Sequence, residues 1–527
     1  MFSAVTILLA LLLLEGIGRI FFVTGSSEFN ERRILESGLS QRKPEGEFRV
    51  FLFGESTMHG SHLYPHSTID RWIKIYLTNL LGEEAAARVK VINFGRLGVA
   101  SDWIADTANE MLSFQPDLSV IYSANNDFII KEYRLGLQTP PPFLQRAVDR
   151  YKKICLRSAL LSGIKRIAIR VKWARKNKRR QNQPPKEEFV DQWHYSIHKS
   201  KVYDVARHLI DPDSDEMRFL ENSWTANLRR IIRHHQKQNI PVAFFNGVSK
   251  INGYGPFEPQ HKPSLTAARS EQWEENEKTA QADFEAGRYN AAAEGFLRAK
   301  AIDDQYALTY FRLGELAELQ KDYTAAYHYY TLASDLDHYP IRAPGFVNAY
   351  YRDLARANDR GVYILDIDSV FKKFSAPGLV GDDLIIDQIH PTMQGQALMA
   401  LEVVKLIYDR DLFLPKERWQ WDRIKPFEEL AAQIEMSDDF LVSLYTYSAR
   451  YVGPYLSIAE TMLESALQIK PKCLLARSHL AWIYWMTDRE DQARSLYKEL
   501  QEEFPAEAKL FFEEKPDIAQ MVNKSDP

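Results

Sequence analysis

Three residues that lie far apart in this chain have the side chains that a nucleophilic serine mechanism requires. Ser56 follows an apolar run over residues 50–53, which predicts a buried β-strand. Asp387 and His390 lie three positions apart in the second half of the sequence. A serine hydroxyl becomes a nucleophile when a base accepts its proton, and the base needs a carboxylate to orient it. We therefore expect Ser56, His390 and Asp387 to meet at the carboxyl edge of a parallel sheet.

The segments around these residues alternate between predicted strands and helices. Strands are expected at 50–53, 89–94, 116–122, 241–246 and 361–367, and helices at 71–81, 103–114, 216–237 and 394–408. Strands and helices that alternate at this spacing form a parallel sheet with right-handed crossovers. The sequence therefore predicts an α/β domain.

Two other parts of the chain show a period of 34 residues. Tyr289 is matched by Tyr323, and Ala459 is matched by Ala493, each 34 positions later. This period, with small residues where two helices touch, resembles tetratricopeptide repeats. Two repeats are few for a free-standing solenoid, so we expect each pair to pack on a neighbouring domain.

The first part of the chain predicts a membrane anchor. Residues 2–23 are mostly apolar and about long enough to cross a bilayer as a helix. Glu15 and Arg19 interrupt this run four positions apart and can pair on one helix face. A cleaved signal peptide is the alternative, but no basic residue precedes the run and no Ala-x-Ala pattern follows it. We expect an uncleaved anchor, with the protein on the periplasmic or extracellular face.

Composition limits the possible partners. A chain of 527 residues is expected to form several domains. The net charge of −4 gives no global attraction to nucleic acid, so no nucleic-acid partner is expected. Cys155 and Cys473 lie in unrelated segments and suggest neither a disulfide nor a metal site. Residues 145–182 are basic and partly amphipathic, which fits a helix on an anionic membrane or acidic polymer as well as a solvated insertion over the sheet.

Four short stretches stand in the order that one enzyme family uses. They are Gly54-Glu55-Ser56, Gly95-Arg96-Leu97-Gly98, Ala124-Asn125-Asn126-Asp127 and Asp387-Gln388-Ile389-His390. Together they resemble the SGNH (GDSL-type) hydrolase family, whose blocks supply Ser, Gly, Asn and His in that order. The match covers about 50–130, 240–250 and 361–410. The resemblance implies a three-layer α/β/α fold of the SGNH or flavodoxin-like type, interrupted here by all-α helical-repeat insertions.

The resemblance also implies roles for individual residues. Ser56 would be the nucleophile, His390 the base and Asp387 the residue that orients the base. The backbone N–H groups of Ser56 and Gly98 and the side-chain amide of Asn126 would form the oxyanion hole. Fixed donors of this kind lower the barrier of acyl transfer by about 3–4 kcal/mol each.

The chain departs from the family pattern at two positions. Glu55 stands where the family usually has Asp, and Ala124 stands where it usually has Gly. Glu55 could alter the hydrogen bonds around the nucleophile loop. The Gly-x-Ser-x-Gly elbow of α/β-hydrolases is disfavoured, because Met58 stands where that motif requires glycine.

With the resemblance, the chain divides into eight predicted parts. They are an anchor or signal at 1–23, a tether at 24–47, hydrolase segments at 48–140, 201–265 and 341–412, a basic helical insertion at 141–200, tetratricopeptide-like repeats at 270–340 and C-terminal helical repeats at 413–520.

Two further groups of residues are weaker site candidates. His59, His62 and His66 lie near Asp70 at a spacing that could hold a metal, but Pro65 interrupts the segment. We expect no metal there, and histidines at the surface or behind the site residues are the simpler interpretation.

Arg342 lies where the first repeat block rejoins the sheet. Its guanidinium could bind an acidic group of the substrate bidentately, which makes it a candidate substrate-binding residue. An interdomain salt bridge is the more ordinary role.

The sequence thus predicts a membrane-anchored serine esterase that needs no cofactor. It would act through a Ser56 acyl-enzyme on O-acyl esters of a glycan, such as an O-acetylated cell-envelope glycan, or on a lipid ester. An O-acyltransferase of the same fold is one alternative. A non-catalytic scaffold of the envelope, whose repeats bind a partner protein, is the other.

Overall fold

The computed structural model describes residues 28–129, 171, 209–375, 377–449 and 456–505 of the chain. Among the helices of these residues, none combines the length and the apolar character needed to cross a membrane. The predicted anchor at 2–23 lies outside the described residues, as does the basic segment at 145–182 apart from Val171.

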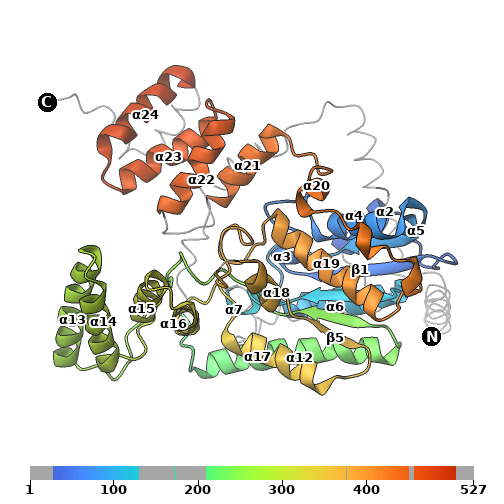
Figure 1. Cartoon of the computed structure of the whole chain (residues 1–527), viewed down its shortest axis with the longest axis horizontal. Helices are drawn as coiled ribbons and strands as arrows, with labels where there is room; N and C mark the ends of the chain where they lie inside the picture. Colours follow the sequence, from blue (N-terminus) through green and yellow to red (C-terminus); the bar gives the residue numbers. More distant parts are fainter. Residues whose placement is uncertain (1–27, 130–170, 172–208, 376, 450–455, 506–527) are drawn as a thin grey trace, which may run out of the picture.

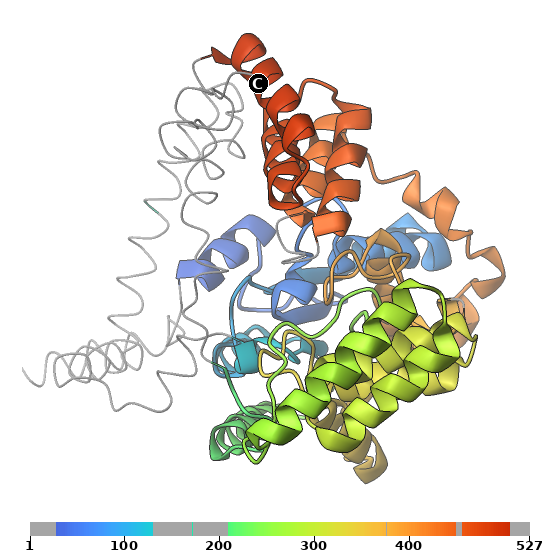
Figure 2. The same ribbon diagram turned by 90° about the vertical axis from the view of Figure 1, so that its left-hand side faces the viewer.

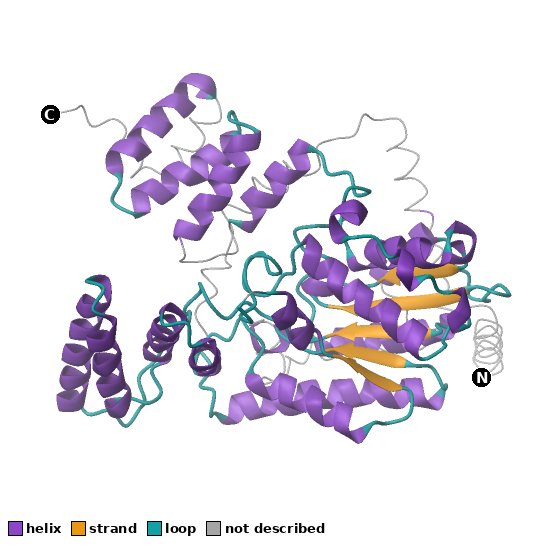
Figure 3. Ribbon diagram, in the orientation of Figure 1, coloured by secondary structure: helices purple, strands orange, loops and turns teal. Residues whose placement is uncertain are grey.

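A sheet of five parallel strands forms the middle layer of the α/β domain (Figure 3). The strands are β1 (Phe48–Gly54), β2 (Val89–Asn93), β3 (Leu118–Tyr122), β4 (Val242–Phe245) and β5 (Val362–Leu365), in the order β2-β1-β3-β4-β5. Every residue of β1 is buried, as expected for a central strand covered on both faces. All five strands lie where the sequence predicts them, which confirms the α/β fold class.

Helices cover both faces of the sheet (Figure 1). One layer contains α4 (Ile69–Leu81), α5 (Glu83–Ala87) and α19 (Met393–Asp409), and the other contains α6 (Ser101–Met111), α12 (Asp215–Lys237) and α17 (Gly345–Ala357). Shorter elements complete the domain: α3 (Ser56–His59), α7 (Asn126–Ile129), α18 (Ile367–Phe374), and the 3-10 turn η1 (Leu112–Phe114). The largest buried side chains are Trp72 on α4 and Trp224 on α12, one in each layer.

Two predicted boundaries need correction, because flanking segments pack on the sheet domain. Residues 28–37 form helix α2 (Glu28–Ser37), and Ile34 and Leu39 join the main core. The prediction of a tether is therefore wrong from Glu28 onward. After α19, residues 413–436 also belong to this domain, since Trp419 and Leu430 lie in the same core. This stretch contains η2 (Lys416–Arg418), η3 (Trp421–Arg423) and α20 (Phe427–Ala431).

The first helical-repeat block consists of two helical hairpins. Its helices are α13 (Ala267–Glu285), α14 (Tyr289–Ile302), α15 (Ala307–Leu319) and α16 (Tyr323–Asp335). Small residues let the helices of each hairpin approach closely: a Cβ atom at Gly295 would lie 2.7 Å from Cβ of Ala280, and one at Gly314 would lie 2.6 Å from the Tyr330 ring. Ala280 and Gly314, which are 34 positions apart (314 − 280 = 34), are each a small residue at such a contact.

The C-terminal block is built in the same way. Its helices are α21 (Asp438–Ser448), α22 (Leu456–Ile469), α23 (Leu474–Met486) and α24 (Glu490–Glu503). Both blocks lie on the side of the sheet where the strands end, the side that also carries α3 and α7 (Figure 1). Figure 2 looks onto this side and shows the C-terminal helices above the first block.

Candidate active site

The sheet order brings three of the four predicted stretches to one edge. β1 pairs with β2 on one side and with β3 on the other, all in parallel. The residues that follow β1 therefore lie between the residues that follow β2 and β3. Ser56 comes from the first group, Gly98 from the second and Asn126 from the third. This arrangement agrees with the predicted edge location.

Ser56 opens the one-turn helix α3 directly after the sharp exit of β1. Gly54 allows this turn, because a Cβ atom there would lie 2.6 Å from the carbonyl oxygen of Tyr122 on the neighbouring strand. Gly95, after β2, is equally restricted: a Cβ atom would lie 2.5 Å from the backbone nitrogen of His59. Only glycine lets these two loops approach so closely beside the serine.

Ser56, His390 and Asp387 form a continuous chain of hydrogen bonds. Oγ of Ser56 lies 2.8 Å from Nε2 of His390, and Nδ1 of His390 lies 2.6 Å from Oδ2 of Asp387. Asp387 and His390 are buried, and Ser56 is half-buried. The structure thus brings together the three residues that the sequence placed in one mechanism.

A tight loop holds Asp387 in place. Its Oδ1 atom accepts hydrogen bonds from the backbone N–H groups of Gln388, Ile389 and His390, at 2.5, 2.9 and 2.9 Å. Burial alone would raise the pKa of Asp387, but the contacts with His390 and His62 outweigh burial and hold that pKa well below its ordinary value. Asp387 is therefore an ionised acceptor throughout the neutral range.

Gly98 and Asn126 follow β2 and β3, the two strands that pair with β1. Gly98 is exposed and has φ of +65°, a left-handed conformation that favours glycine. Asn126 is buried, and its Nδ2 donates one hydrogen bond to the carbonyl oxygen of Val99 at 2.8 Å. That bond fixes the orientation of the amide, whose second N–H remains for another acceptor.

Glu55 joins the nucleophile loop to the loop that carries Asn126. Its buried carboxylate accepts hydrogen bonds from the backbone N–H groups of Ala124, Asn125 and Asn126, at 3.0, 3.2 and 3.2 Å. Burial raises the pKa of Glu55 to about 8, and the nearby Asp127 acts in the same direction, against the three N–H donors. Glu55 therefore bridges the loops that follow β1 and β3.

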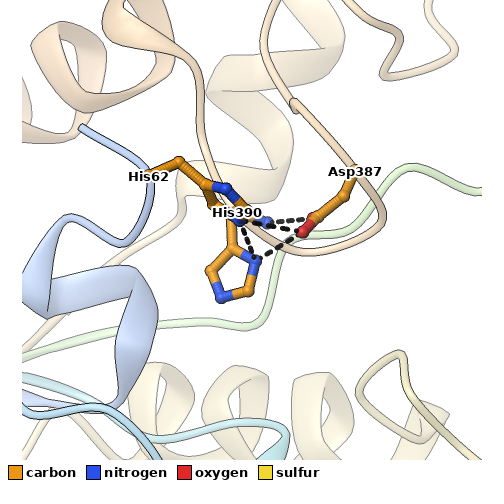
Figure 4. A group of neighbouring side chains, drawn as sticks. All are labelled: His62, Asp387 and His390. Atoms are coloured by element: carbon orange, nitrogen blue, oxygen red, sulfur yellow. Dashed lines mark hydrogen bonds and ion pairs between the residues drawn. The ribbon is translucent and has the colours of Figure 1, made fainter. Parts of the chain in front are cut away.

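His62 lies behind the site residues, one of the two positions that the sequence left open for it. This side chain is fully buried, and its Nε2 lies 3.2 Å from Oδ2 of Asp387 and 3.3 Å from Nδ1 of His390 (Figure 4). The three residues come from two loops far apart in the chain. The only cue in the sequence was that His62 follows Ser56 by six positions.

The other members of the histidine group point elsewhere. The ring of His59 stacks on Tyr64, and Nδ1 of His66 lies 3.1 Å from the carbonyl oxygen of Glu435. Asp70 accepts a hydrogen bond from Nδ2 of Asn93 at 3.1 Å. The structure therefore does not bring these three residues together with His62 as a set of metal ligands.

Arg342 links two segments of the protein, which agrees with the more ordinary of its two predicted roles, although its acceptors here are backbone carbonyls. The side chain is buried, its Nε donates to the carbonyl oxygen of Lys250 at 2.9 Å, and its Nη2 donates to the carbonyl oxygen of Tyr254. These bonds tie the loop after β4 to the end of the first repeat block. The proposed substrate-binding role is therefore corrected: the guanidinium is engaged by backbone acceptors inside the protein.

Comparison with protein-family models and with curated proteins gives no match. Among solved structures, the chain is similar to a Bacteroides fragilis protein provisionally assigned as an acylhydrolase, at 12% identity over 73% of this chain and 99% of that chain, with a TM-score of 0.29. It is similar to a GDSL-like lipase from Bacteroides thetaiotaomicron, at 11% identity over 73% of this chain and 100% of that one, with a TM-score of 0.28.

A tetratricopeptide-repeat protein from Thermus thermophilus matches at 17% identity, over 47% of this chain and 98% of that chain, with a TM-score of 0.14. Because all three TM-scores are low, the functional conclusions below rest on the geometry of this chain. The fold itself defines an α/β protein with a parallel sheet and helical-repeat blocks, and GDSL-like and tetratricopeptide-repeat proteins are among its structural neighbours.

Proposed function

We propose that this protein is an SGNH-type serine esterase that acts through an acyl-enzyme on Ser56. The observation that carries the proposal is the hydrogen-bonded chain from Oγ of Ser56 through His390 to Asp387, at 2.8 and 2.6 Å. A hydroxyl, an imidazole and an ionised carboxylate in this order are the parts of a serine nucleophile with its base.

In this mechanism, Nε2 of His390 accepts the hydroxyl proton while Oγ of Ser56 attacks the carbonyl carbon of an ester. The negative charge that develops on the carbonyl oxygen is stabilised by N–H donors from Ser56, Gly98 and Asn126. The intermediate collapses to an acyl-enzyme, and His390 returns the proton to the departing alcohol. Water then attacks the acyl group by the reverse path and releases the acid.

Asp387 stays ionised through these steps. It holds the imidazole with Nδ1–H toward the carboxylate and Nε2 toward Ser56, and it stabilises the imidazolium that forms. The buried Glu55 bridge keeps the Asn126 loop beside the nucleophile, so the amide donor is fixed before the substrate arrives.

The substrate class is proposed from the sequence. The apolar segment at 2–23 supports action at a membrane, on the periplasmic or extracellular face, on O-acyl esters of an envelope glycan or on a lipid ester. The two helical-repeat blocks at the sheet edge support a protein partner that binds beside the site. If the hydroxyl group of an acceptor molecule attacks the acyl-enzyme in place of water, the same protein is an O-acyltransferase.

Labelling with a fluorophosphonate, followed by identification of the modified residue, tests the nucleophile directly. We expect modification at Ser56 and loss of both labelling and aryl-ester turnover in Ser56→Ala. Ser113→Ala is the matched control, because its Oγ only bonds the carbonyl oxygen of Glu110. Background aryl-ester turnover that Ser56→Ala leaves unchanged would support a scaffold in place of an enzyme.

An ester panel with added hydroxyl acceptors then separates hydrolase from transferase. A hydrolase releases free acid at a rate that does not depend on the acceptor. A transferase forms a new ester in proportion to the acceptor concentration, at the expense of free acid.

A further inference from the structure

The imidazole of His62 links the predicted triad to the C-terminal helices. On one side, its Nε2 lies 3.2 Å from Oδ2 of Asp387. On the other side, its Nδ1 lies 3.0 Å from Oγ of Ser448, the last residue of α21. His62 and Ser448 are both buried. The imidazole of His62 therefore connects Asp387 with the C-terminal helical block.

The donors and acceptors of this network can be assigned consistently. Oδ2 of Asp387 accepts one bond from Nδ1–H of His390 and a second from Nε2–H of His62. With its proton on Nε2, His62 accepts a hydrogen bond at Nδ1 from the hydroxyl group of Ser448. The 3.3 Å approach between the two imidazole nitrogens follows, because both N–H groups share one acceptor oxygen.

His62 acts here as a neutral imidazole. Burial lowers the pKa of His62, although the hydrogen bond with Asp387 opposes this. Protons, and not a metal, fit the spacing: Nδ1 of His390 and Oδ2 of Asp387 are 2.6 Å apart. Two ligands of one tetrahedral zinc ion would be about 3.3 Å apart at bond lengths of about 2.0–2.1 Å.

The loop that carries His62 is held by the C-terminal block. The ring of Tyr447 lies 5.1 Å from the ring of His62, and Phe440 lies 4.3 Å from the ring of His66. His62 itself has φ of +69°, a left-handed conformation that a residue with a Cβ atom seldom adopts. Such a conformation persists when surrounding contacts determine it, and the contacts here come from Asp387 and α21.

We propose that His62 and Ser448 form a second hydrogen-bonded arm that positions Asp387, so that the C-terminal helical block completes the active site. The inference rests on the proposed esterase function, since it assigns the arm to the acid of that mechanism. His62 and Ser448 are positioning residues: they act on Asp387 and contact no substrate. Asp387 would then be held by three backbone N–H groups on Oδ1 and by two imidazoles on Oδ2.

Substitutions in the full-length protein separate this arm from mere packing. In His62→Gln, the amide nitrogen takes the place of Nε2 and keeps a donor for Asp387, so kcat should stay within roughly 3-fold of wild type. His62→Asn places its amide near Nδ1 and removes that donor, and kcat should fall by roughly 10-fold or more. KM should change little in both, because neither side chain contacts the substrate.

Ser448→Ala tests the link to the C-terminal block. We expect kcat to fall by roughly 3-fold, and we expect no further fall when the change is added to His62→Asn, because the arm is already broken. Ser443→Ala is the matched control on the same helix, because the Oγ atom of Ser443 donates to the carbonyl oxygen of Asp439 within α21. Thermal unfolding of each variant shows whether a loss of kcat reflects unfolding.

The inference is overturned if His62→Asn keeps the wild-type kcat, or if Ser448→Ala and His62→Asn act additively. It is also overturned if kcat falls by the same factor in His62→Gln and His62→Asn. Equal losses would show that His62 acts through packing and not through a hydrogen bond to Asp387. These outcomes differ from failure of the proposed function. In that case the Ser56→Ala variant would keep its aryl-ester turnover and would still be labelled by the fluorophosphonate.

Discussion

The Nε2 atom of His390 lies 2.8 Å from the Oγ atom of Ser56, although 334 positions separate the two residues in the chain. The first repeat block is inserted between them, and the sheet still brings them together. Ser56 follows β1, and His390 lies between β5 and α19, in a loop closed by a bridge between Ile385 and Pro391. The fold therefore accommodates the inserted block and still places the two reacting groups side by side.

Asp387→Asn should reduce kcat by about 10⁴-fold while the fold remains intact. The new amide would present N–H to the imidazole and favour the tautomer whose Nε2 already carries a proton. His390 could then no longer accept the proton of Ser56. Steady-state turnover of a short-chain aryl ester measures the effect.

Asp383→Asn is the control for that substitution. Asp383 lies in the same loop and accepts hydrogen bonds from Oγ of Ser375, away from the imidazole. Its kcat should stay close to wild type. An Asp387→Asn variant that retained a tenth of the wild-type kcat would contradict the proposed role of the carboxylate.

Asn126→Ala should lower kcat by about 10²–10³-fold and leave KM nearly unchanged, because an oxyanion donor acts mainly in the transition state. Asn125→Ala is the neighbouring control. The Nδ2 atom of Asn125 donates to the carbonyl oxygen of Ile341, so its loss should reduce stability and leave kcat of the folded protein unchanged. Equal kcat values for the two variants would remove Asn126 from the oxyanion hole.

Glu55 should make the folding stability depend on pH. Its pKa is about 8 in the folded protein against 4.5 for the free group, so the folded state binds the proton more tightly between these values. The free energy of unfolding contributed by Glu55 should therefore fall as pH rises from about 4.5 to about 8, by at most about 1.4 kcal/mol per pH unit.

Urea unfolding of wild type and Glu55→Gln at several pH values in this range measures the effect. The substitution removes the titrating group, so the stability of the variant should depend less steeply on pH. The side-chain amide of glutamine also directs an N–H group toward the backbone N–H groups that donate to Glu55. Two donors then face each other, so the variant should be less stable at every pH. Parallel pH curves for the two proteins would show that Glu55 does not titrate in this window.

The sheet and the triad could be predicted because both depend on local patterns. Buried strands of a parallel sheet appear as short apolar runs, and β1 and β3 are buried at every position. Once the strands are known, the residues after their carboxyl ends must share one edge. That rule places Ser56, Asn126 and Gly98 at one edge, while the roles expected of Asn126 and Gly98 come from the resemblance to the SGNH family.

The specific partners of His62 and Arg342 could not be predicted, because they depend on how separate segments pack. His62 reaches Asp387 only because its backbone is left-handed and α21 covers the loop. Arg342 finds its acceptors on the loop after β4, which comes close only when the first repeat block has folded against the sheet. Neither relationship leaves a period or a motif in the sequence.

Arg342→Ala should destabilise the protein without changing KM. The substitution leaves the carbonyl oxygens of Lys250 and Tyr254 buried and without this donor, which should cost about 2–4 kcal/mol. Arg356→Ala is the control, because the side chain of Arg356 is 75% exposed and should contribute little. A raised KM in Arg342→Ala, at unchanged stability, would restore the substrate-binding role.

Gly314→Ala should destabilise the first repeat block by about 1–3 kcal/mol, although alanine normally favours a helix by about 1 kcal/mol over glycine. The added Cβ atom would lie 2.6 Å from the ring of Tyr330, whose hydroxyl is held by a 2.6 Å hydrogen bond to Glu318. Thermal unfolding measures the change. Tyr330→Leu makes room for the new methyl group, so the double variant should be more stable than the sum of the single effects predicts. A stability gain in Gly314→Ala alone would show that the two helices can separate without cost.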